Sequence, residues 1–232
     1  MIDDYNIMSF FIIVCDSLSI KITGYMHGRI TKNHYIHKKY KFSSFITWSN
    51  YFKSKIMKIN NQYKSSDVKT NIKLKFENKK ISSRKVKYKI PSILIIQENE
   101  IGNKLYKIII KKLIKINNLK LFFKFRPKEE PNKLLVNLLE NNNIKFYHTE
   151  NIEDIIVKNQ INIFLGHNST MLLDAIYYNI FPISLNINNK NKTINKNANV
   201  FIIKSLVGID RKLNLILKKK KVLRNLKKKI WI

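Results

Sequence analysis

One segment, residues 161–185 (INIFLGHNSTMLLDAIYYNIFPISL), constrains the fold of this chain more than any other. Its apolar run from Ile161 to Leu165 is short and ends at Gly166, which predicts a central strand of a parallel sheet. A polar turn follows, then a helix, and then a second apolar run that begins near Pro182. This order of strand, turn, helix and strand predicts an α/β domain.

The polar turn in this segment predicts an anion site. Gly166 gives the backbone freedom at the turn, and Asn168 or Ser169 can cap the helix that follows. The free N–H groups and positive dipole end of that helix would face a phosphate above the sheet. Thr170 and Asp174 share a helix face, so a hydroxyl would lie near the phosphate and a carboxylate one turn deeper, near a ribose. The unit therefore suits a nucleotide, although such caps are also common in helices that bind nothing.

The same alternation extends over residues 91–207. Apolar runs at 92–97, 120–125 and 144–147 alternate with helical patterns at 103–116, 131–141 and 152–158. The pattern predicts a Rossmann-like parallel sheet with helices on both faces, whose ligands bind beyond the carboxyl ends of the strands. Lys124 and Arg126 lie at one such end, and period-two alternation places both on one side, where they could reach one phosphate.

The residues from Gly166 to Leu185 resemble the phosphate- and ribose-binding segment of GT-B glycosyltransferases and related sugar-nucleotide enzymes. The family more often has Glu at Asp174 and Gly at Asn179. The resemblance implies a nucleotide-sugar donor held by this segment. The matching residues are Gly166, His167, Asn168, Ser169, Thr170, Asp174 and Pro182.

Two further segments resemble the same enzymes. LFFKFRPKEEP, residues 121–131, is similar to the K-x-H-P signature of capsule-type glycosyltransferases, polysialyltransferase-like enzymes and glycerophosphotransferases, with Arg126 in place of His. Arg stays charged at neutral pH, so this change favours diphosphate binding over proton transfer. KITGYMHG, residues 21–28, resembles the end of the N-terminal domain, and the resemblance places His27 at the interdomain cleft as a candidate base, phosphate donor or capping group.

These patterns divide the chain into four parts. Residues 1–56 are predicted to be a partial second α/β domain, the remnant of an N-terminal acceptor-side domain, with strands at 19–25 and 45–49. Residues 57–90 read as a basic linker, 91–207 as the nucleotide-sugar-binding domain, and 208–232 as a basic amphipathic helix. We favour packing of this helix on the sheet, with a membrane-surface helix as the alternative. An N-terminal GT-B domain has more strands than this, so the chain reads as a truncated member or as one completed by another polypeptide.

The chain has 45 Lys and Arg against 15 Asp and Glu, a formal net charge of +30. Only five of the 45 are Arg, and no RNA-binding motif is visible, so nucleic acid is not an expected partner. The charge would attract phosphorylated substrates, and it admits an anionic membrane surface as a further partner. The single cysteine, Cys15, excludes an internal disulfide, and Asp3 and Asp4 stand where an export signal needs positive charge.

We therefore expect a glycosyltransferase that moves a sugar from a nucleotide-activated donor to a surface polysaccharide or lipid-linked glycan. It would be cytoplasmic or peripheral at the inner face of the membrane. No Asp/Glu cluster for a divalent metal is visible, so we expect metal-independent transfer without a cofactor besides the donor. A nucleotide-sugar 2-epimerase-like enzyme and a non-catalytic module that binds nucleotide or anionic membrane remain as alternatives.

Overall fold

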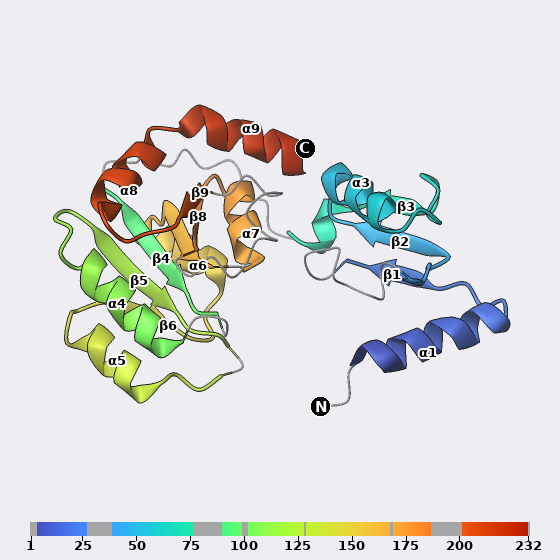
Figure 1. The fold of residues 1–232 in the computed structure, drawn as a ribbon, viewed down its shortest axis with the longest axis horizontal. Helices are drawn as coiled ribbons and strands as arrows, with labels where there is room; N and C mark the ends of the chain where they lie inside the picture. Colours follow the sequence, from blue (N-terminus) through green and yellow to red (C-terminus); the bar gives the residue numbers. More distant parts are fainter. Residues whose placement is uncertain are drawn as a thin grey trace. The chain divides into compact units, whose positions relative to one another are not determined.

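The computed structural model describes residues 4–26, 39–76, 90–98, 102–127, 129–167, 169–186 and 201–231. The chain forms two compact units. Unit 1 comprises residues 1–79 and 227–232, and unit 2 comprises residues 80–226. Figure 1 shows the elements of both.

Unit 2 is built on a parallel sheet in the order β6-β5-β4-β7-β8-β9. The chain runs outward from β4 to β6, returns to β7 beside β4, and continues to β9, so the strand order reverses between β4 and β7. Ligands of open α/β sheets bind at such a reversal. The strands are β4 (Ser92–Ile96), β5 (Lys120–Lys124), β6 (Lys145–Tyr147), β7 (Ile163–Gly166), β8 (Phe181–Leu185) and β9 (Phe201–Ile203).

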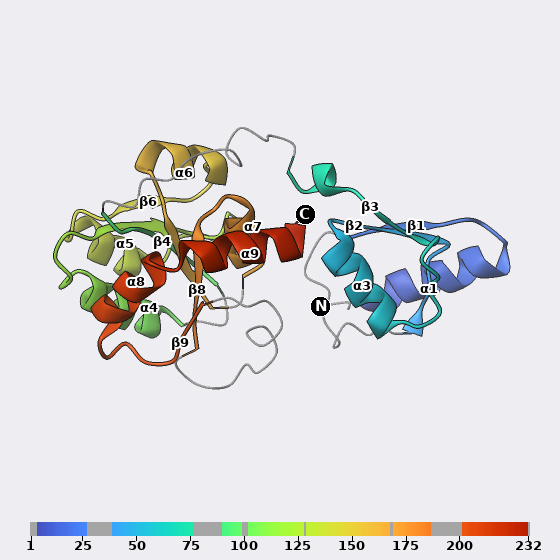
Figure 2. The ribbon, with the colours of Figure 1, turned by 90° about the horizontal axis from the view of Figure 1, so that it is seen from above.

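Helices cover both faces of this sheet, as Figure 2 shows. One face carries α4 (Asn103–Leu113), α5 (Lys133–Glu140) and α8 (Ile209–Leu217), and the other carries α6 (Ile152–Asn159) and α7 (Met171–Tyr177). All residues of β4, β7 and β8 are buried, as expected for central parallel strands. The predicted Rossmann-like α/β fold is confirmed, with differences only at the ends of the elements from 92 to 185.

A row of aromatic rings packs around the end of β5. The ring of Phe123 lies 5.4 Å from that of Tyr106 and 4.8 Å from that of Phe125. Phe125 continues the row to Phe146 at 5.6 Å. Rings at these separations interact favourably beyond the area they bury.

Unit 1 contains a smaller parallel sheet in the order β1-β2-β3. Parallel strands need a crossover connection, and α3 supplies it between β2 and β3, with Phe52 and Ile56 fully buried. The elements are α1 (Asp4–Ser17), β1 (Thr23–Tyr25), β2 (Ser44–Thr47), α3 (Asn50–Ile59), β3 (Val68–Thr70) and the 3₁₀ helix η1 (Ile72–Leu74).

The structure differs from the sequence prediction in the segment expected to be a basic linker. The end of α3, β3 and η1 all fall within residues 57–76, and unit 1 extends to Lys79. Val68 and Phe76 are buried, whereas Lys69 and Lys73 are exposed. The exposed lysines of this segment thus belong to the solvated face of a folded region and not to a linker. The rest of the expected linker before Ile90 lies outside the described residues.

The expected C-terminal helix consists of two helices, α8 and α9 (Lys220–Trp231). Leu213, Leu223 and Leu226 are buried, as the packed alternative requires, whereas Leu215 and Val222 are exposed. Residues 227–232 belong to unit 1.

The ring of Trp231 completes an aromatic cluster in unit 1. It lies 6.2 Å from the ring of Trp48, 5.6 Å from that of Phe52 and 5.1 Å from that of Phe76. The Ser49 hydroxyl donates to the carbonyl of Ile230 beside it. The core of unit 1 is therefore built from residues far apart in the sequence.

Gly24 in β1 lies against two buried rings. A Cβ there would be 2.6 Å from Cδ2 of Phe45 and 2.9 Å from Cδ2 of Phe42. We expect Gly24→Ala to destabilise unit 1 by about 1–3 kcal/mol through overpacking. Denaturation followed by tryptophan fluorescence measures this, because both tryptophans of the chain lie in unit 1. The control Lys69→Ala, at an exposed position of β3, should stay within about 0.5 kcal/mol; equal shifts would refute the steric argument.

Candidate functional site

A cavity of about 610 Å³ lies in unit 2 at the carboxyl ends of β4, β5 and β7, where the strand order reverses. Its volume is in the range of small-molecule sites. The loops after several strands contribute to it, as the topology requires. The lining residues include Gln97, Glu98, Lys124, Arg126, Glu150, Ser169, Thr170, Met171, Asp174 and Tyr178.

Lys124 reaches the cavity from the last position of β5. Its side chain is buried, and Nζ donates to the carbonyl of His148 at 2.6 Å. Burial lowers the pKa of Lys124, while the charge of Glu150 opposes that shift. An ammonium has three protons, so Lys124 can donate to a ligand and to His148 together.

Arg126 is fixed by bonds to its neighbours in the loop after β5. Its guanidinium pairs with Glu129, and its backbone N–H donates to Oε1 of Gln97 at 3.2 Å. The ring Nε2 of His148 donates to the Arg126 carbonyl at 3.0 Å. Both cations selected from the sequence thus line one cavity, and each also has an acceptor within the protein.

The turn between β7 and α7 brings a second group of predicted residues to the cavity. Oγ of Ser169 accepts from the N–H of Met171 at 3.2 Å. This bond caps the start of α7, as expected for Ser169, whereas the side chain of Thr170 makes no capping hydrogen bond. Thr170 and Asp174 both line the cavity, in agreement with their spacing. Asn168 lies outside the described residues.

Gly166 and His167 hold the loop that carries Glu98. The His167 N–H donates to Oε1 of Glu98 at 2.6 Å, and its ring Nδ1 donates to the carbonyl of Leu185 at 2.5 Å. The Ser184 hydroxyl donates to the His167 carbonyl at 2.6 Å. A Cβ on Gly166 would lie 2.6 Å from the same Glu98 oxygen. These two residues therefore position a wall of the cavity.

Sequence analysis did not select Glu150 and Tyr178. The hydroxyl of Tyr178 donates to Oε1 of Glu153 at 2.9 Å, and burial together with this bond raises the pKa of Tyr178, so it stays protonated at neutral pH. Backbone N–H groups, first that of Glu150 itself and then that of His148, lower the pKa of the Glu150 carboxyl. Glu150 lies in the loop after a predicted strand, so the rule that ligands bind beyond the carboxyl ends of the strands could have selected it. Tyr178 gives no such signal in the sequence.

The charged side chains of the lining are of both signs. Lys124 and Arg126 come from the end of β5, and the carboxylates of Glu98, Glu150 and Asp174 come from other loops and from α7. Cations can bind phosphate, and carboxylates can accept hydrogen bonds from hydroxyl groups. The cavity is thus suited to a ligand that has both.

The remaining predictions concern a metal and His27. Within the described ranges no group of three or more His, Cys, Asp or Glu is arranged to hold a metal ion. His27, the candidate catalytic residue, lies outside those ranges.

No protein-family model and no curated protein sequence matches this chain. Several solved structures match its fold. The wall teichoic acid polymerase TagF matches with a TM-score of 0.54 and 10% identity, over 89% of this chain and 58% of TagF. The pneumococcal O-GlcNAc transferase GtfA in complex with UDP and GlcNAc matches with a TM-score of 0.52 and 11% identity, over 93% of this chain and 50% of GtfA. HepE from Anabaena in complex with UDP-glucose matches with a TM-score of 0.50 and 9% identity, over 97% of this chain and 72% of HepE.

The fold of this chain is therefore the Rossmann-like GT-B type found in these structures. The chain spans 58% of the length of TagF and 50% of that of GtfA. At such identities the likeness concerns the fold alone.

Proposed function

We propose that this chain belongs to a GT-B-type glycosyltransferase and binds a nucleotide-activated sugar in the cavity of unit 2. The observation that carries the proposal is the meeting of cations, hydroxyls and carboxylates where the strand order of the sheet reverses. GtfA is in complex with UDP and HepE with UDP-glucose, so uridine nucleotides are the first donors to test.

In this proposal each group binds one part of the donor. Lys124 and Arg126 neutralise the diphosphate, and the hydroxyls of Ser169 and Thr170 donate to its oxygens. Asp174 accepts from the ribose hydroxyls. The negative charge that develops on the leaving diphosphate is stabilised by the same cations, which are already oriented by the protein. The transfer needs no metal ion.

The proposed acceptor is a glycan of a surface polysaccharide or a lipid-linked glycan. TagF, a wall teichoic acid polymerase, shares the fold, which supports an acceptor of this class. His27 follows β1 by two residues and is the proposed base for the acceptor hydroxyl.

A non-catalytic nucleotide-binding module is the second candidate. Arg126 occupies the position where the resembling signature has His, and it pairs with Glu129. A guanidinium does not transfer protons at neutral pH, so this position offers binding without proton transfer. Release of free nucleotide in the presence of glycan acceptors distinguishes an enzyme from a module.

Calorimetric titration tests the site. We expect selective binding of one class among UDP-, CDP-, CMP- and GDP-compounds, weakened roughly tenfold to a hundredfold in Asp174→Ala because ribose hydroxyls lose their charged acceptor. Thr170→Ala should weaken it less. The matched control Asp154→Ala, at an exposed position of α6, should bind like the wild type. Equal binding of all polyanions, or full affinity in Asp174→Ala, would rule out this pocket.

A further inference from the structure

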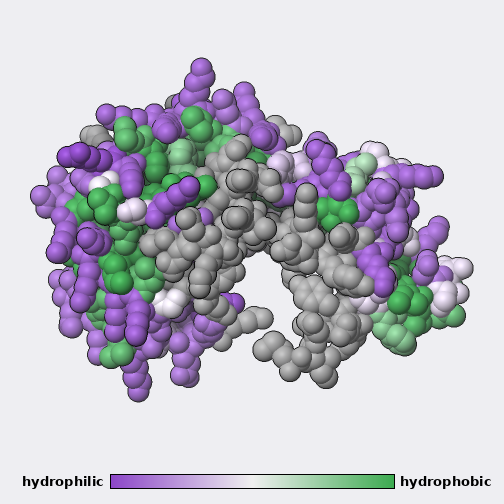
Figure 3. All heavy atoms as spheres, viewed as in Figure 1, coloured by the Kyte–Doolittle hydropathy of each residue, from purple (hydrophilic) through white to green (hydrophobic). Residues whose placement is uncertain are grey.

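Helix α1 and the turn that follows it present a cluster of exposed apolar side chains. Phe10 is 69% exposed, Phe11 52% and Ile13 51%. Leu18 and Ile20 continue the cluster after the helix. Figure 3 shows hydrophobic residues gathered over this element. We call these five residues the α1 cluster. An exposed patch of this kind usually marks an interaction surface.

The helix is fixed to unit 1 by its other side. Ile12 is 3% exposed and Cys15 is 5% exposed, so both are buried in the unit. From Tyr5 to Cys15 the sequence has no charged residue, in a chain with a net charge of +30. In α8 and α9 the exposed apolar side chains are single ones, Leu215 and Val222, whereas α1 exposes Phe10, Phe11 and Ile13 close together.

A cavity of about 370 Å³ adjoins the α1 cluster. One wall is apolar and includes Ile13 and Ile20 of the cluster, with Asp16 as its carboxylate. Lys39 and Lys41, from a second segment of the chain, also line the cavity. Both lysines are exposed; Nζ of Lys39 lies 5.6 Å from the centroid of the Tyr40 ring, and Nζ of Lys41 pairs with Asp67 at 2.8 Å. The full lining is Ile12, Ile13, Asp16, Ile20, Ile22, Lys39, Tyr40, Lys41, Phe42, Ser43 and Gln62.

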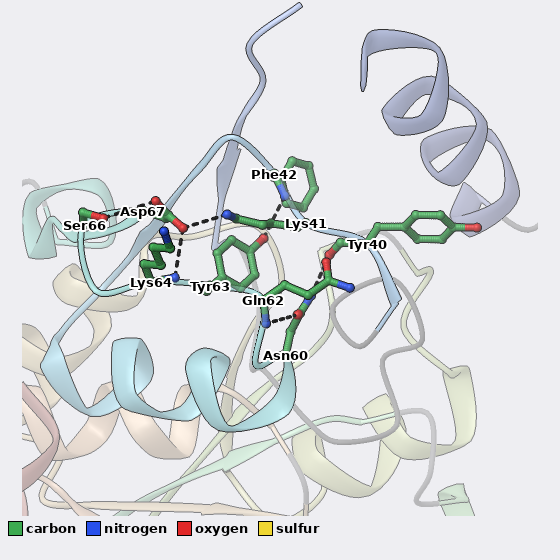
Figure 4. A network of polar contacts seen from close by, with 9 residues as sticks. All are labelled: Tyr40, Lys41, Phe42, Asn60, Gln62, Tyr63, Lys64, Ser66 and Asp67. Carbon is green, nitrogen blue, oxygen red and sulfur yellow. Dashed lines mark hydrogen bonds and ion pairs between the residues drawn. The ribbon is translucent and has the colours of Figure 1, made fainter. Parts of the chain in front are cut away.

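The segment from Tyr40 to Phe42, which contributes to this lining, is held by the polar network of Figure 4. Nδ2 of Asn60 donates to the Tyr40 carbonyl at 3.0 Å, and the Phe42 N–H donates to the Tyr63 hydroxyl at 3.0 Å. The Gln62 N–H donates to Oδ1 of Asn60 at 3.0 Å. Because Tyr40 and Phe42 are both bonded to residues at and after the end of α3, this segment, which follows Lys39 directly, is in place before any ligand binds.

We propose that the α1 cluster and this cavity together form a docking site for an anionic lipid bilayer. The apolar side chains enter the interface between headgroups and acyl chains, while Lys39 at the cavity meets a lipid phosphate. None of the described helices is long and apolar enough to span a membrane, so α1 lies along the surface.

Charge complementarity selects a bilayer over a second copy of this chain. A second copy would bring another charge of +30 to the contact, whereas an anionic leaflet attracts it. Apolar insertion by α1 and the attraction of the basic chain to an anionic leaflet give the two signals that stable peripheral binding needs.

Co-sedimentation with vesicles tests the proposal. We expect the full chain to bind vesicles of phosphatidylcholine with about one-third phosphatidylglycerol, and pure phosphatidylcholine at least roughly tenfold more weakly. Phe10→Ser/Phe11→Ser should weaken binding to the mixed vesicles roughly tenfold, and Lys39→Ala roughly threefold. The control Leu134→Ser/Val157→Ser, at exposed apolar positions of unit 2, should bind like the wild type. Equal losses in both double variants, or no vesicle binding by the wild type, would overturn the proposal.

A fluorescence measurement does not depend on the stability of the double variant. Both native tryptophans, Trp48 and Trp231, are buried, so a new tryptophan at position 10 reports on α1. Vesicles of brominated phosphatidylcholine and phosphatidylglycerol should quench Phe10→Trp and leave the control Leu134→Trp unchanged. If Phe10→Trp sediments with the vesicles but its fluorescence is not quenched, insertion of α1 is refuted. The proposal is also refuted if the wild type forms a dimer, does not bind vesicles, and loses the dimer in Phe10→Ser/Phe11→Ser.

Discussion

Trp231→Ala is expected to lower the free energy of unfolding of unit 1 by about 3–5 kcal/mol. The ring is 4% exposed and contacts three other aromatic rings, those of Trp48, Phe52 and Phe76. Its removal leaves a cavity that the surrounding rings can fill only in part, which adds to the lost burial. Trp48 remains as the fluorescent reporter of unit 1 in denaturant titrations.

Two variants calibrate this result. Trp231→Phe keeps an aromatic ring in the cluster and should lose clearly less stability than the alanine variant. Val222→Ala, at an exposed position of the same helix, should change stability by no more than about 0.5 kcal/mol. A loss below about 1 kcal/mol in Trp231→Ala would show that the cluster is not part of the core of unit 1.

Phe123→Ala should destabilise unit 2 by a similar amount, about 3–5 kcal/mol. Phe123 is fully buried at the centre of the aromatic row, against Tyr106. The Tyr106 hydroxyl accepts from the Glu98 N–H at 2.6 Å and donates to the Ile96 carbonyl at 3.0 Å. Loss of Phe123 would therefore also loosen one wall of the cavity in unit 2.

The measurement for Phe123→Ala is denaturation followed by far-ultraviolet circular dichroism, because the tryptophans of the chain report on unit 1. Ile108→Ala, at an exposed position of α4, is the control and should stay within about 0.5 kcal/mol. If both variants lost the same stability, the core role of Phe123 would be wrong.

The fold of unit 2 could be predicted because its signals are local. Runs such as 92–97 and 161–165 are short, apolar and bounded by polar residues, and the helices between them have clear periodicity. Parallel topology then follows from the alternation of strands and helices. Unit 1 gave weaker signals. In 57–76 the lysines conceal the few buried positions, and α1 is apolar on more than one face, so it shows no clear period.

The part of the candidate site that lies at the ends of the predicted strands could be predicted from the sequence. Lys124, Arg126 and the turn after β7 lie where the carboxyl edge of a parallel sheet must bring them. The pairing of Arg126 with Glu129 and the bonds of His167 to Glu98 and Leu185 depend on how side chains orient within the loops. Tyr178 enters the cavity only because α7 packs as it does, and no local pattern encodes that.

The position of Trp231 has a consequence for the order of events during synthesis. Domains generally fold as the ribosome releases them, the N-terminal one first. Here the partners Trp48, Phe52 and Phe76 are made early, and all of unit 2 is translated before Trp231 joins them. The aromatic core of nascent unit 1 therefore stays incomplete until α9 has been synthesised. During this interval its exposed aromatic side chains are available for chaperone binding.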